Sequence, residues 1–280
     1  MKIMIHGGFF SESSQSEEIK GLKQDALGEI IQKSYHFLLS NTALDTVVYA
    51  VQLLEDHPLF NAGIGSQLQK DGKIRMSAAL MDGKSKKFSG VLNIESIQNP
   101  IHVARALQMV DDRVLGGEGA INFAKNMGKE IVDVEIPERR KEYENRVKSA
   151  GIGTVGCVVL DNKGHLAAAT STGGKGFELP GRISDSATVA GNYANDFCAI
   201  SCTGVGEDIV SGALAAKIVT RVTDGMSIKD SFAKSFQELK EFDGFAGAIG
   251  LDALGNMYYQ ESHPKIVYAS FDGVNLCVFS

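Results

Sequence analysis

The sequence predicts a mixed α/β protein in which β-sheets are sandwiched between layers of helices. Two observations lead to this class. Apolar, β-branched stretches typical of strands alternate with longer segments whose apolar residues recur at helical spacing. The order strand, two helices, strands is expected both before and after a charged segment at 135–148, near the middle of the chain. No internal repeat and no low-complexity tract accompanies this order.

In the first half of the chain, capping residues and prolines mark the helix boundaries. Ser14 and Glu17 have the spacing of a capping box at the start of a helix. Asn99 followed by Pro100 is an N-cap with a proline at the first helical position. The pattern predicts strands at 2–5, 74–81 and 88–94, and helices at 14–39, from 41 to before Pro58, at 101–110 and at 117–126; His6-Gly7-Gly8 should end the first strand.

The second half follows the charged segment. Residues 135–148 combine charges of both signs with almost no apolar periodicity, which fits a solvated helix, but their polarity and position favour a linker. Ser227 and Asp230 mark the start of a later helix. The pattern predicts strands at 155–160, 165–172, 197–202, 245–251, 256–259 and 274–279, a loop or strand at 187–195, and helices at 207–222 and 228–242.

The strands at 155–160 and 165–172 are predicted to form a hairpin whose turn fixes their register. The sequence Asp161-Asn162-Lys163-Gly164 suits a type I turn with Gly164 in the left-handed conformation. Asp161 then faces His165, the numbers of paired residues sum to 326, and Thr154 faces Thr172 at the open end. Taken alone, two facing threonines are an ordinary strand pair, because threonine favours strands.

Composition excludes several classes of function. The net charge of −6 provides no basic excess for binding nucleic acid. The four cysteines form no C-x-x-C pair and no metal-ligand pattern with the six histidines, so they are expected to be free thiols in a reducing compartment. The apolar run at the N-terminus is too short for a signal peptide, and no stretch is long enough to span a membrane. The cytoplasm is therefore the expected location.

Several motifs, in order along the chain, carry a resemblance to a known family. They are IHGG at 5–8, HPLFNAGIGS at 57–66, LMDG at 80–83, GTVGCVVLDNKGHLAAATSTGG at 153–174, LPGRISDS at 179–186 and SCTGVGE at 201–207. Together they resemble the plant-type L-asparaginase and isoaspartyl peptidase family. Its members are N-terminal-nucleophile hydrolases, made as precursors that cleave themselves before the threonine of a G-T-V-G motif.

The resemblance implies a specific fold and a processing event. The fold would be the four-layer αββα sandwich of N-terminal-nucleophile hydrolases, formed by residues 1–280 as a single domain. Cleavage of the Gly153–Thr154 bond would give an α subunit of 1–153 and a β subunit of 154–280, with the charged linker at about 127–153. The assembly would be a homodimer of such αβ heterodimers.

Thr154 is a poor nucleophile until this cleavage frees its α-amine. As an internal residue it has no adjacent base, whereas a freed α-amine, with a pKa of about 7.7–8.0, can take the proton of its own hydroxyl. The resemblance gives Thr172 a supporting role beside Thr154, and gives the Thr203 hydroxyl and the Gly204 N–H the role of an oxyanion hole. The glycines after Thr203 also suit a plain strand-to-helix turn. A nucleotide loop is a third interpretation, but Ile209 stands where G-x-G-x-x-G needs its last glycine.

Arg182 and Asp185 are the candidates for substrate binding. A substrate with a free α-carboxylate and α-ammonium needs a cation and an anion close together, and arginine offers a planar fork for the carboxylate. On the surface, the same two residues would be an ion pair of about 1 kcal/mol or less. The resemblance assigns Arg182 and Asp185 to the substrate, adds the backbone of Gly206, and places Asn61 near the nucleophile.

The loop at 54–64 resembles the family's stabilisation loop, in which backbone carbonyls hold a sodium ion. Catalysis itself would need no cofactor. The matching carbonyl ligands are those of Leu54, Glu55, His57, Phe60, Ala62 and Ile64. The His57 side chain is expected to pack rather than to bind a metal.

The resemblance implies an amidohydrolase that releases L-aspartate from β-aspartyl peptides and from L-asparagine through an acyl-enzyme on Thr154. Two alternatives stay open: a glycosylasparaginase, and a relative that is neither processed nor active. Departures from the family pattern at 76–78, 184–186 and 260–262 leave the substrate preference undecided.

Overall fold

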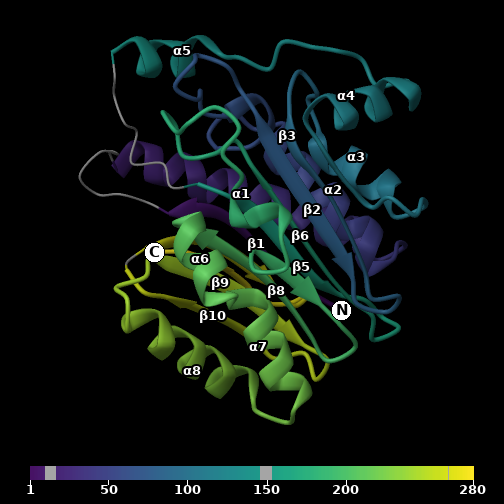
Figure 1. The fold of residues 1–280 in the computed structure, drawn as a ribbon. Coiled ribbons are helices and arrows are strands. Elements are labelled where there is room, and N and C mark those ends of the chain that lie inside the picture. The colour runs from purple at the N-terminus through teal and green to yellow at the C-terminus, as the bar shows by residue number, and fades with distance from the viewer. Residues whose placement is uncertain (10–16, 146–152, 264) are drawn as a thin grey trace.

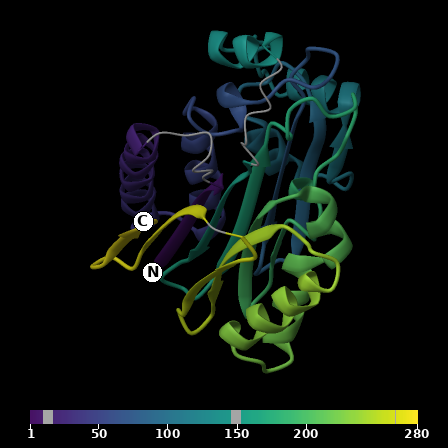
Figure 2. The ribbon, with the colours of Figure 1, turned by 90° about the vertical axis from the view of Figure 1, so that its left-hand side faces the viewer.

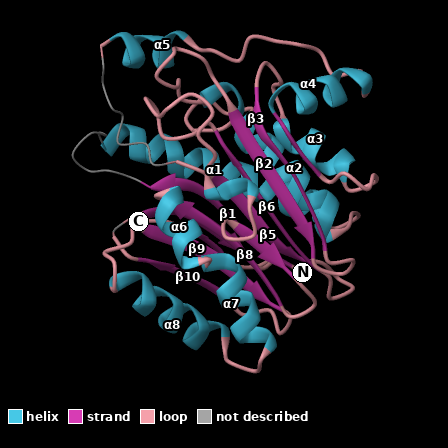
Figure 3. Cartoon of the chain, viewed as in Figure 1, coloured by secondary structure: helices cyan, strands magenta, loops and turns pink. Residues whose placement is uncertain are grey.

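The computed structural model describes residues 1–9, 17–145, 153–263 and 265–280, and it confirms the mixed α/β class (Figure 1). Two β-sheets pack against each other through their central strands, and helices pack on both (Figures 1 and 3). Within the described ranges, no helix is long and apolar enough to cross a membrane. The predicted capping residue Ser14 and the end of the predicted linker, 146–152, lie outside the described residues.

The larger sheet interleaves strands from both halves of the chain. Its order is β12-β11-β1-β5-β6-β2-β3-β4, and its strands are antiparallel except for β3 and β4. The strands are β1 (Lys2–Phe9), β2 (Met76–Asp82), β3 (Lys87–Ile94), β4 (Val114–Gly116), β5 (Val155–Leu160), β6 (Leu166–Thr172), β11 (Ile266–Phe271) and β12 (Leu276–Val278). Strand β5, which follows the candidate nucleophile, is therefore held between β1 and β6.

The smaller sheet comes entirely from the second half of the chain. Its order is β10-β9-β8-β7, and all its pairs are antiparallel. The strands are β7 (Asn192–Ala194), β8 (Cys198–Gly204), β9 (Ala246–Asp252) and β10 (Met257–Glu261). Strand β8 packs against both β5 and β6, so the two sheets meet at the hairpin that the sequence analysis singles out.

The helices divide between the two sheets, as Figure 2 shows from the side. Helices α1 (Glu17–Leu38), α2 (Ala43–Glu55), α3 (Pro100–Leu107) and α4 (Gly117–Asn126) pack on the larger sheet, and α7 (Leu214–Thr223) and α8 (Ile228–Lys240) on the smaller one. Apolar side chains fill both boundaries: Val47 and Leu54 of α2 belong to the main core, while Ile218 of α7 and Phe232 of α8 belong to a second cluster. Ser227 caps α8 as predicted, and Thr42 caps α2; Asn99 precedes α3 as predicted but makes no side-chain capping hydrogen bond among the described residues.

The predicted hairpin register is confirmed. Val155 pairs with Ser171 and Leu160 with Leu166, so the numbers of paired residues sum to 326. Gly164 has φ +77°, and its N–H donates to the carbonyl of Asp161, as the predicted turn requires. The turn alone therefore aligns Thr154 with Thr172 at the other end of the hairpin.

Several elements differ from the sequence predictions. Strand β1 does not end at Ile5, because Gly7 pairs with Val155 and its missing side chain leaves room for the ring of Phe60. The predicted helix at 207–222 is two helices, α6 (Gly206–Gly212) and α7, since Ala213 has φ +47°. Residues Pro137–Glu144 of the predicted linker form α5, which buries none of its residues. Strands β4 and β11 were not predicted.

Candidate active site

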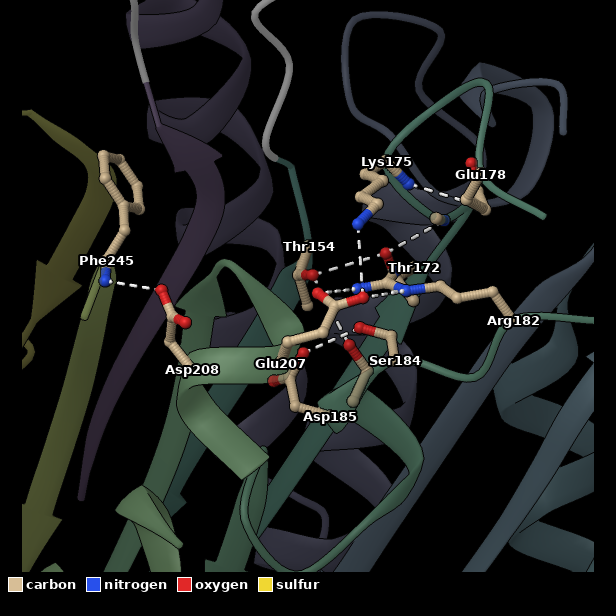
Figure 4. Close-up of polar contacts among 12 residues, drawn as sticks. Thr154, Thr172, Lys175, Glu178, Arg182, Ser184, Asp185, Glu207, Asp208 and Phe245 are labelled. Carbon is tan, nitrogen blue, oxygen red and sulfur yellow. Dashed lines mark hydrogen bonds and ion pairs between the residues drawn. The ribbon is translucent and has the colours of Figure 1, made fainter. Parts of the chain in front are cut away.

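Thr154 lies directly before β5 and is almost fully buried. Its Oγ1 donates a hydrogen bond to Oγ1 of Thr172, 3.3 Å away, and lies 3.4 Å from Oγ of Ser186. Figure 4 shows the Thr154 and Thr172 side chains pointing toward each other. Within the described part of the chain, the Thr154 hydroxyl contacts only other hydroxyls, so no side-chain base adjoins it.

The carbonyl of Gly153, which precedes Thr154, is held by two side chains. Asn61 Nδ2 donates to it at 2.8 Å, and Thr172 Oγ1 donates at 3.3 Å. The Thr172 hydroxyl also accepts from the Gly174 N–H. The Asn61 amide is fixed in turn, since its Oδ1 accepts from the Gln67 N–H. The structure thus brings Asn61, Thr154 and Thr172 together around one peptide bond.

His6 anchors the backbone of Thr154. Its Nδ1 donates to the Thr154 carbonyl at 2.9 Å, so its Nε2 must accept from the hydroxyl of Ser201, 2.7 Å away. Burial lowers the pKa of His6 to about 3, although the bond to Thr154 acts the other way. His6 is therefore a neutral anchor at neutral pH, and its partner Ser201 lies on β8 of the smaller sheet.

Thr203 follows Ser201 by two positions on β8, and side chains two apart on a strand share a face. Because Ser201 reaches His6 on the larger sheet, Thr203 faces the larger sheet as well. The Thr203 hydroxyl is fully buried and has no hydrogen-bond partner within the described residues. Gly204 has φ +143°, and a side chain there would strike the backbone of Phe245. A buried donor without a partner suits an oxyanion hole.

Arg182 and Asp185 are not an ion pair with each other. Asp185 is buried; its Oδ1 accepts from the Ser184 hydroxyl, and its Oδ2 has no partner among the described residues. Burial raises the pKa of Asp185 to about 6, while the Ser184 hydrogen bond and the Arg182 charge act in the other direction. A side chain at Gly206 would lie 2.8 Å from Arg182 Nη2 and 2.9 Å from Asp185 Oδ1. The backbone of Gly206 therefore lies where these two groups converge.

The partner of Arg182 is Glu207, which sequence reasoning missed. Arg182 Nε and Nη2 donate to the two carboxylate oxygens of Glu207, at 3.0 and 2.8 Å, and Lys175 Nζ lies 3.2 Å from Oε1 (Figure 4). Ser186, also missed, lies beside the Thr154 hydroxyl in the 3₁₀ turn Asp185–Ala187. Its place in the motif LPGRISDS was the signal that could have drawn attention to it.

The loop at 54–64 turns back on itself at Gly63. Gly63 has φ +55°, and a side chain there would lie 2.1 Å from the Glu55 carbonyl oxygen. Among the described residues, the carbonyls of His57, Phe60 and Ala62 each accept one backbone hydrogen bond and keep a second lone pair, while that of Leu54 accepts from the His57 N–H. Neutral carbonyl oxygens suit a hard cation. The His57 ring packs against Phe60, and its Nδ1 accepts from the Leu59 N–H, so its side chain serves packing.

The side chain of Glu55 supports the hairpin from α2. Its Oε1 accepts from the hydroxyl of Ser171, 2.6 Å away, and from the Ile101 N–H. Burial raises the pKa of Glu55 to about 8, although both hydrogen bonds act in the other direction. Ser171 adjoins Thr172, so this bond holds β6 where the candidate site needs it.

Comparison with known proteins places the chain in a family. A family model described as asparaginase matches residues 1–150 and 135–276. An isoaspartyl peptidase/L-asparaginase of Nostoc sp. is 43% identical, covering 97% of this chain and 92% of that protein. An isoaspartyl peptidase of Escherichia coli is 38% identical (91% and 88%), and a plant-type L-asparaginase of Pyrococcus furiosus is 34% identical (95% of each). The chain belongs to the asparaginase family.

Proposed function

We propose that this protein is an isoaspartyl peptidase and L-asparaginase that uses Thr154 as its nucleophile. The observation that carries the proposal is the contact of Thr172 with both the Thr154 hydroxyl and the Gly153 carbonyl. The same hydroxyl pair can serve two reactions, first on the chain's own peptide bond and then on a substrate amide. The family membership and the near full-length relatives support this assignment.

The first reaction is cleavage of the Gly153–Thr154 bond. Oγ1 of Thr154 attacks the carbonyl carbon of Gly153, the C–N bond breaks, and the hydroxyl proton passes to the leaving nitrogen, which leaves an ester and a free amine on Thr154. Water then hydrolyses the ester and releases the Gly153 carboxylate. Asn61 and Thr172 donate to the oxygen on which negative charge develops. The products are residues 1–153 and 154–280.

The second reaction uses the new α-amine as the base. It takes the proton of the Thr154 hydroxyl while Oγ1 attacks the β-carbonyl carbon of the substrate. The partnerless hydroxyl of Thr203 and the N–H of Gly204 stabilise the resulting oxyanion. The amine returns the proton to the leaving group, which is ammonia or an amino acid, and water hydrolyses the acyl-enzyme to release L-aspartate.

Substrate recognition rests on opposite charges around Gly206. Arg182 binds the α-carboxylate of the aspartyl group, and the buried, partnerless Oδ2 of Asp185 accepts from its α-ammonium. Asp185 is costly to keep ionised without a partner, which is a reason to expect a cationic ligand there.

Three further features of this assignment are inferred with it. We infer the four-layer αββα fold of N-terminal-nucleophile hydrolases, which two packed sheets with helices on both support. The carbonyls of the 54–64 loop hold a sodium ion, which would raise the melting temperature in sodium relative to tetramethylammonium salts. The processed protein forms a homodimer of αβ heterodimers in the cytoplasm, and its mass by sedimentation equilibrium tests the assembly.

The deciding experiment is a denaturing gel with intact mass measurement, together with an assay of L-aspartate release from a β-aspartyl dipeptide, L-asparagine and a glycosylated asparagine. Two fragments that meet at Thr154 and activity on the first two substrates are expected. Thr154→Ala should remove both cleavage and activity, while Thr154→Ser keeps part of each. An intact wild-type chain after long incubation, or processing in Thr154→Ala, would overturn the proposal.

A further inference from the structure

Two charged side chains beside the candidate substrate site have no role in the reaction described above. Glu207, in the first turn of α6, bridges the cations of Arg182 and Lys175. The Arg182 side chain is only 13% exposed, while those of Lys175 and Glu207 are 47% and 51% exposed. Glu207 therefore covers one edge of the Arg182 guanidinium, while Glu207 and Lys175 are themselves about half exposed to solvent.

Glu207 occupies only one edge of the Arg182 guanidinium. A guanidinium carries five N–H donors, and Glu207 takes the one on Nε and one on Nη2. Across the described residues, Nη1 has no hydrogen-bond partner. The end formed by Nη1 and the second N–H of Nη2 is thus free for a carboxylate. Nη2 also faces Gly206 and Asp185, where the aspartyl group is expected to lie.

Without Lys175, the negative charge of Glu207 would weaken the attraction of Arg182 for a substrate carboxylate. Partial burial raises the pKa of Glu207, but the hydrogen bonds and charge of Arg182 and the hydrogen bond of Lys175 outweigh it and lower this pKa to about 2. Glu207 is therefore an anion at neutral pH and would cancel the charge of Arg182. Lys175 leaves the three side chains with one net positive charge, which attracts a carboxylate.

We propose that Glu207 positions the Arg182 guanidinium and that Lys175 offsets the charge of Glu207, so that the three residues select substrates with a free α-carboxylate. This inference rests on the assignment of Arg182 to the substrate's α-carboxylate made above. Lys175 and Glu207 are positioning and specificity residues, since both act through Arg182. They stabilise the fold little, because exposed ion pairs contribute about 1 kcal/mol or less.

The test measures kcat and KM of the processed protein for a β-aspartyl dipeptide. Lys175→Met should raise KM about five- to tenfold with kcat within about twofold of the native value, since Arg182 and Glu207 then cancel each other's charge. Adding Glu207→Gln should bring KM back to within about twofold, because the amide removes the negative charge and keeps an oxygen acceptor for Arg182. Adding Glu207→Ala should not restore KM, because that acceptor is lost.

Inhibition constants separate charge from general damage. Lys175→Met should weaken inhibition by L-aspartate about as much as it raises KM, and should leave inhibition by the α-amide of L-aspartate unchanged. The chain also provides a matched control, because Lys217 and Arg221 bridge Glu238 on α7 and α8 in the same way. Lys217→Met should change neither KM nor either inhibition constant.

The inference is overturned by an unchanged KM in Lys175→Met, by no recovery on adding Glu207→Gln, or by equal KM values for the Gln and Ala double variants. Arg182→Lys shows which assignment has failed. If it raises KM and Lys175→Met does not, only the role of the bridge is wrong. If Arg182→Lys also leaves KM unchanged, the substrate carboxylate binds elsewhere and the proposed recognition fails first.

Discussion

Thr172 Oγ1 lies 3.3 Å from Thr154 Oγ1 and also 3.3 Å from the Gly153 carbonyl oxygen. One hydroxyl thus contacts both the proposed attacking atom and the bond that it would break. Each atom has a definite role: Thr154 and the Gly174 N–H donate to Thr172, and Thr172 donates to Gly153. This arrangement makes Thr172 the most informative position for mutation after Thr154 itself.

Thr172→Val keeps the shape of the side chain and removes its hydroxyl. We expect processing to slow by about 10²-fold, because the developing oxyanion loses one of two donors and Thr154 loses its acceptor. The measurement is the rate at which the two fragments appear on a denaturing gel. Thr172→Ser is the control and should process within about tenfold of the native rate. Equal rates in Val and native proteins would contradict the role of Thr172.

Asn61→Asp exchanges one atom at the Gly153 carbonyl. Aspartate can still accept from the Gln67 N–H, but it places an oxygen where Asn61 Nδ2 donates. We expect cleavage to slow by about 10²-fold or more, with the folded state retained, because the donor becomes a repelling acceptor. Gel densitometry measures the rate, and circular dichroism checks folding. Cleavage at the native rate would show that Asn61 is not needed there.

Asp185→Asn should stabilise the protein while removing substrate binding. The pKa of Asp185 is raised from 3.8 to about 6 in the fold, so the folded state binds this proton more tightly than the unfolded state does. Stability is therefore lost as the pH rises from about 4 to about 6, by about 3 kcal/mol, since tenfold in an acid constant is about 1.4 kcal/mol.

Asp185→Asn removes the free-energy cost of ionising this buried carboxyl in the folded state. In urea unfolding it should be about 1–3 kcal/mol more stable than the native protein at pH 8, and no more stable near pH 4. Ser184→Ala is a useful comparison, because it removes the hydrogen bond to Asp185 Oδ1 and should lower stability at pH 8. An Asn variant that is less stable than the native protein at pH 8 would contradict the cost assigned to Asp185.

The pH profile of kcat/KM should show two inflections, and neither should come from a histidine. Asp185 must be ionised to bind an ammonium, which gives an inflection near its pKa of about 6. The Thr154 α-amine must be neutral, which gives a second inflection somewhat below 8, because burial and the nearby Arg182 charge lower its pKa. His6, with a pKa of about 3, is already neutral in this range.

The same profile in His6→Gln and His57→Gln tests the identity of the base. Both variants should keep the upper inflection, even where processing or stability falls. Loss of that inflection in either variant would mean that a histidine is the base, and that the amine of Thr154 is not.

Local sequence rules predicted the part of the site that depends on local geometry. The turn at Asp161–Gly164 determines the register of β5 and β6, so the pairing of Thr154 with Thr172 follows from a few residues. Strand β11 could have been predicted as well, because its sequence IVYASF is apolar and rich in strand-forming residues. The break at Ala213 could not, since the apolar spacing continues through it.

The charge network depends on contacts between distant segments, and sequence reasoning did not find Glu207 as the partner of Arg182. Arg182 and Asp185 are three apart in the chain, but Arg182 binds Glu207, 25 residues away, while Asp185 Oδ2 has no hydrogen-bond partner among the described residues. The link from His6 to Ser201 spans 195 residues and depends on how the two sheets pack. Such pairings follow from the order of strands and the meeting of layers, which short motifs do not specify.

The interleaved strand order of the larger sheet affects how the processed protein refolds. Strand β1 lies between β11 and β5, and β2 pairs with β6, so strands from before Thr154 pair with strands from after it at three places in the sheet. If the chain is cut as proposed, no peptide bond joins its two pieces, which are then held together by non-covalent contacts such as these shared strand edges and the core. Refolding after full denaturation then requires two separate molecules to meet, so its rate depends on concentration, whereas the uncut chain refolds alone. Dilution therefore slows the recovery of the cleaved protein after denaturation, whereas it does not affect the recovery of the uncut chain.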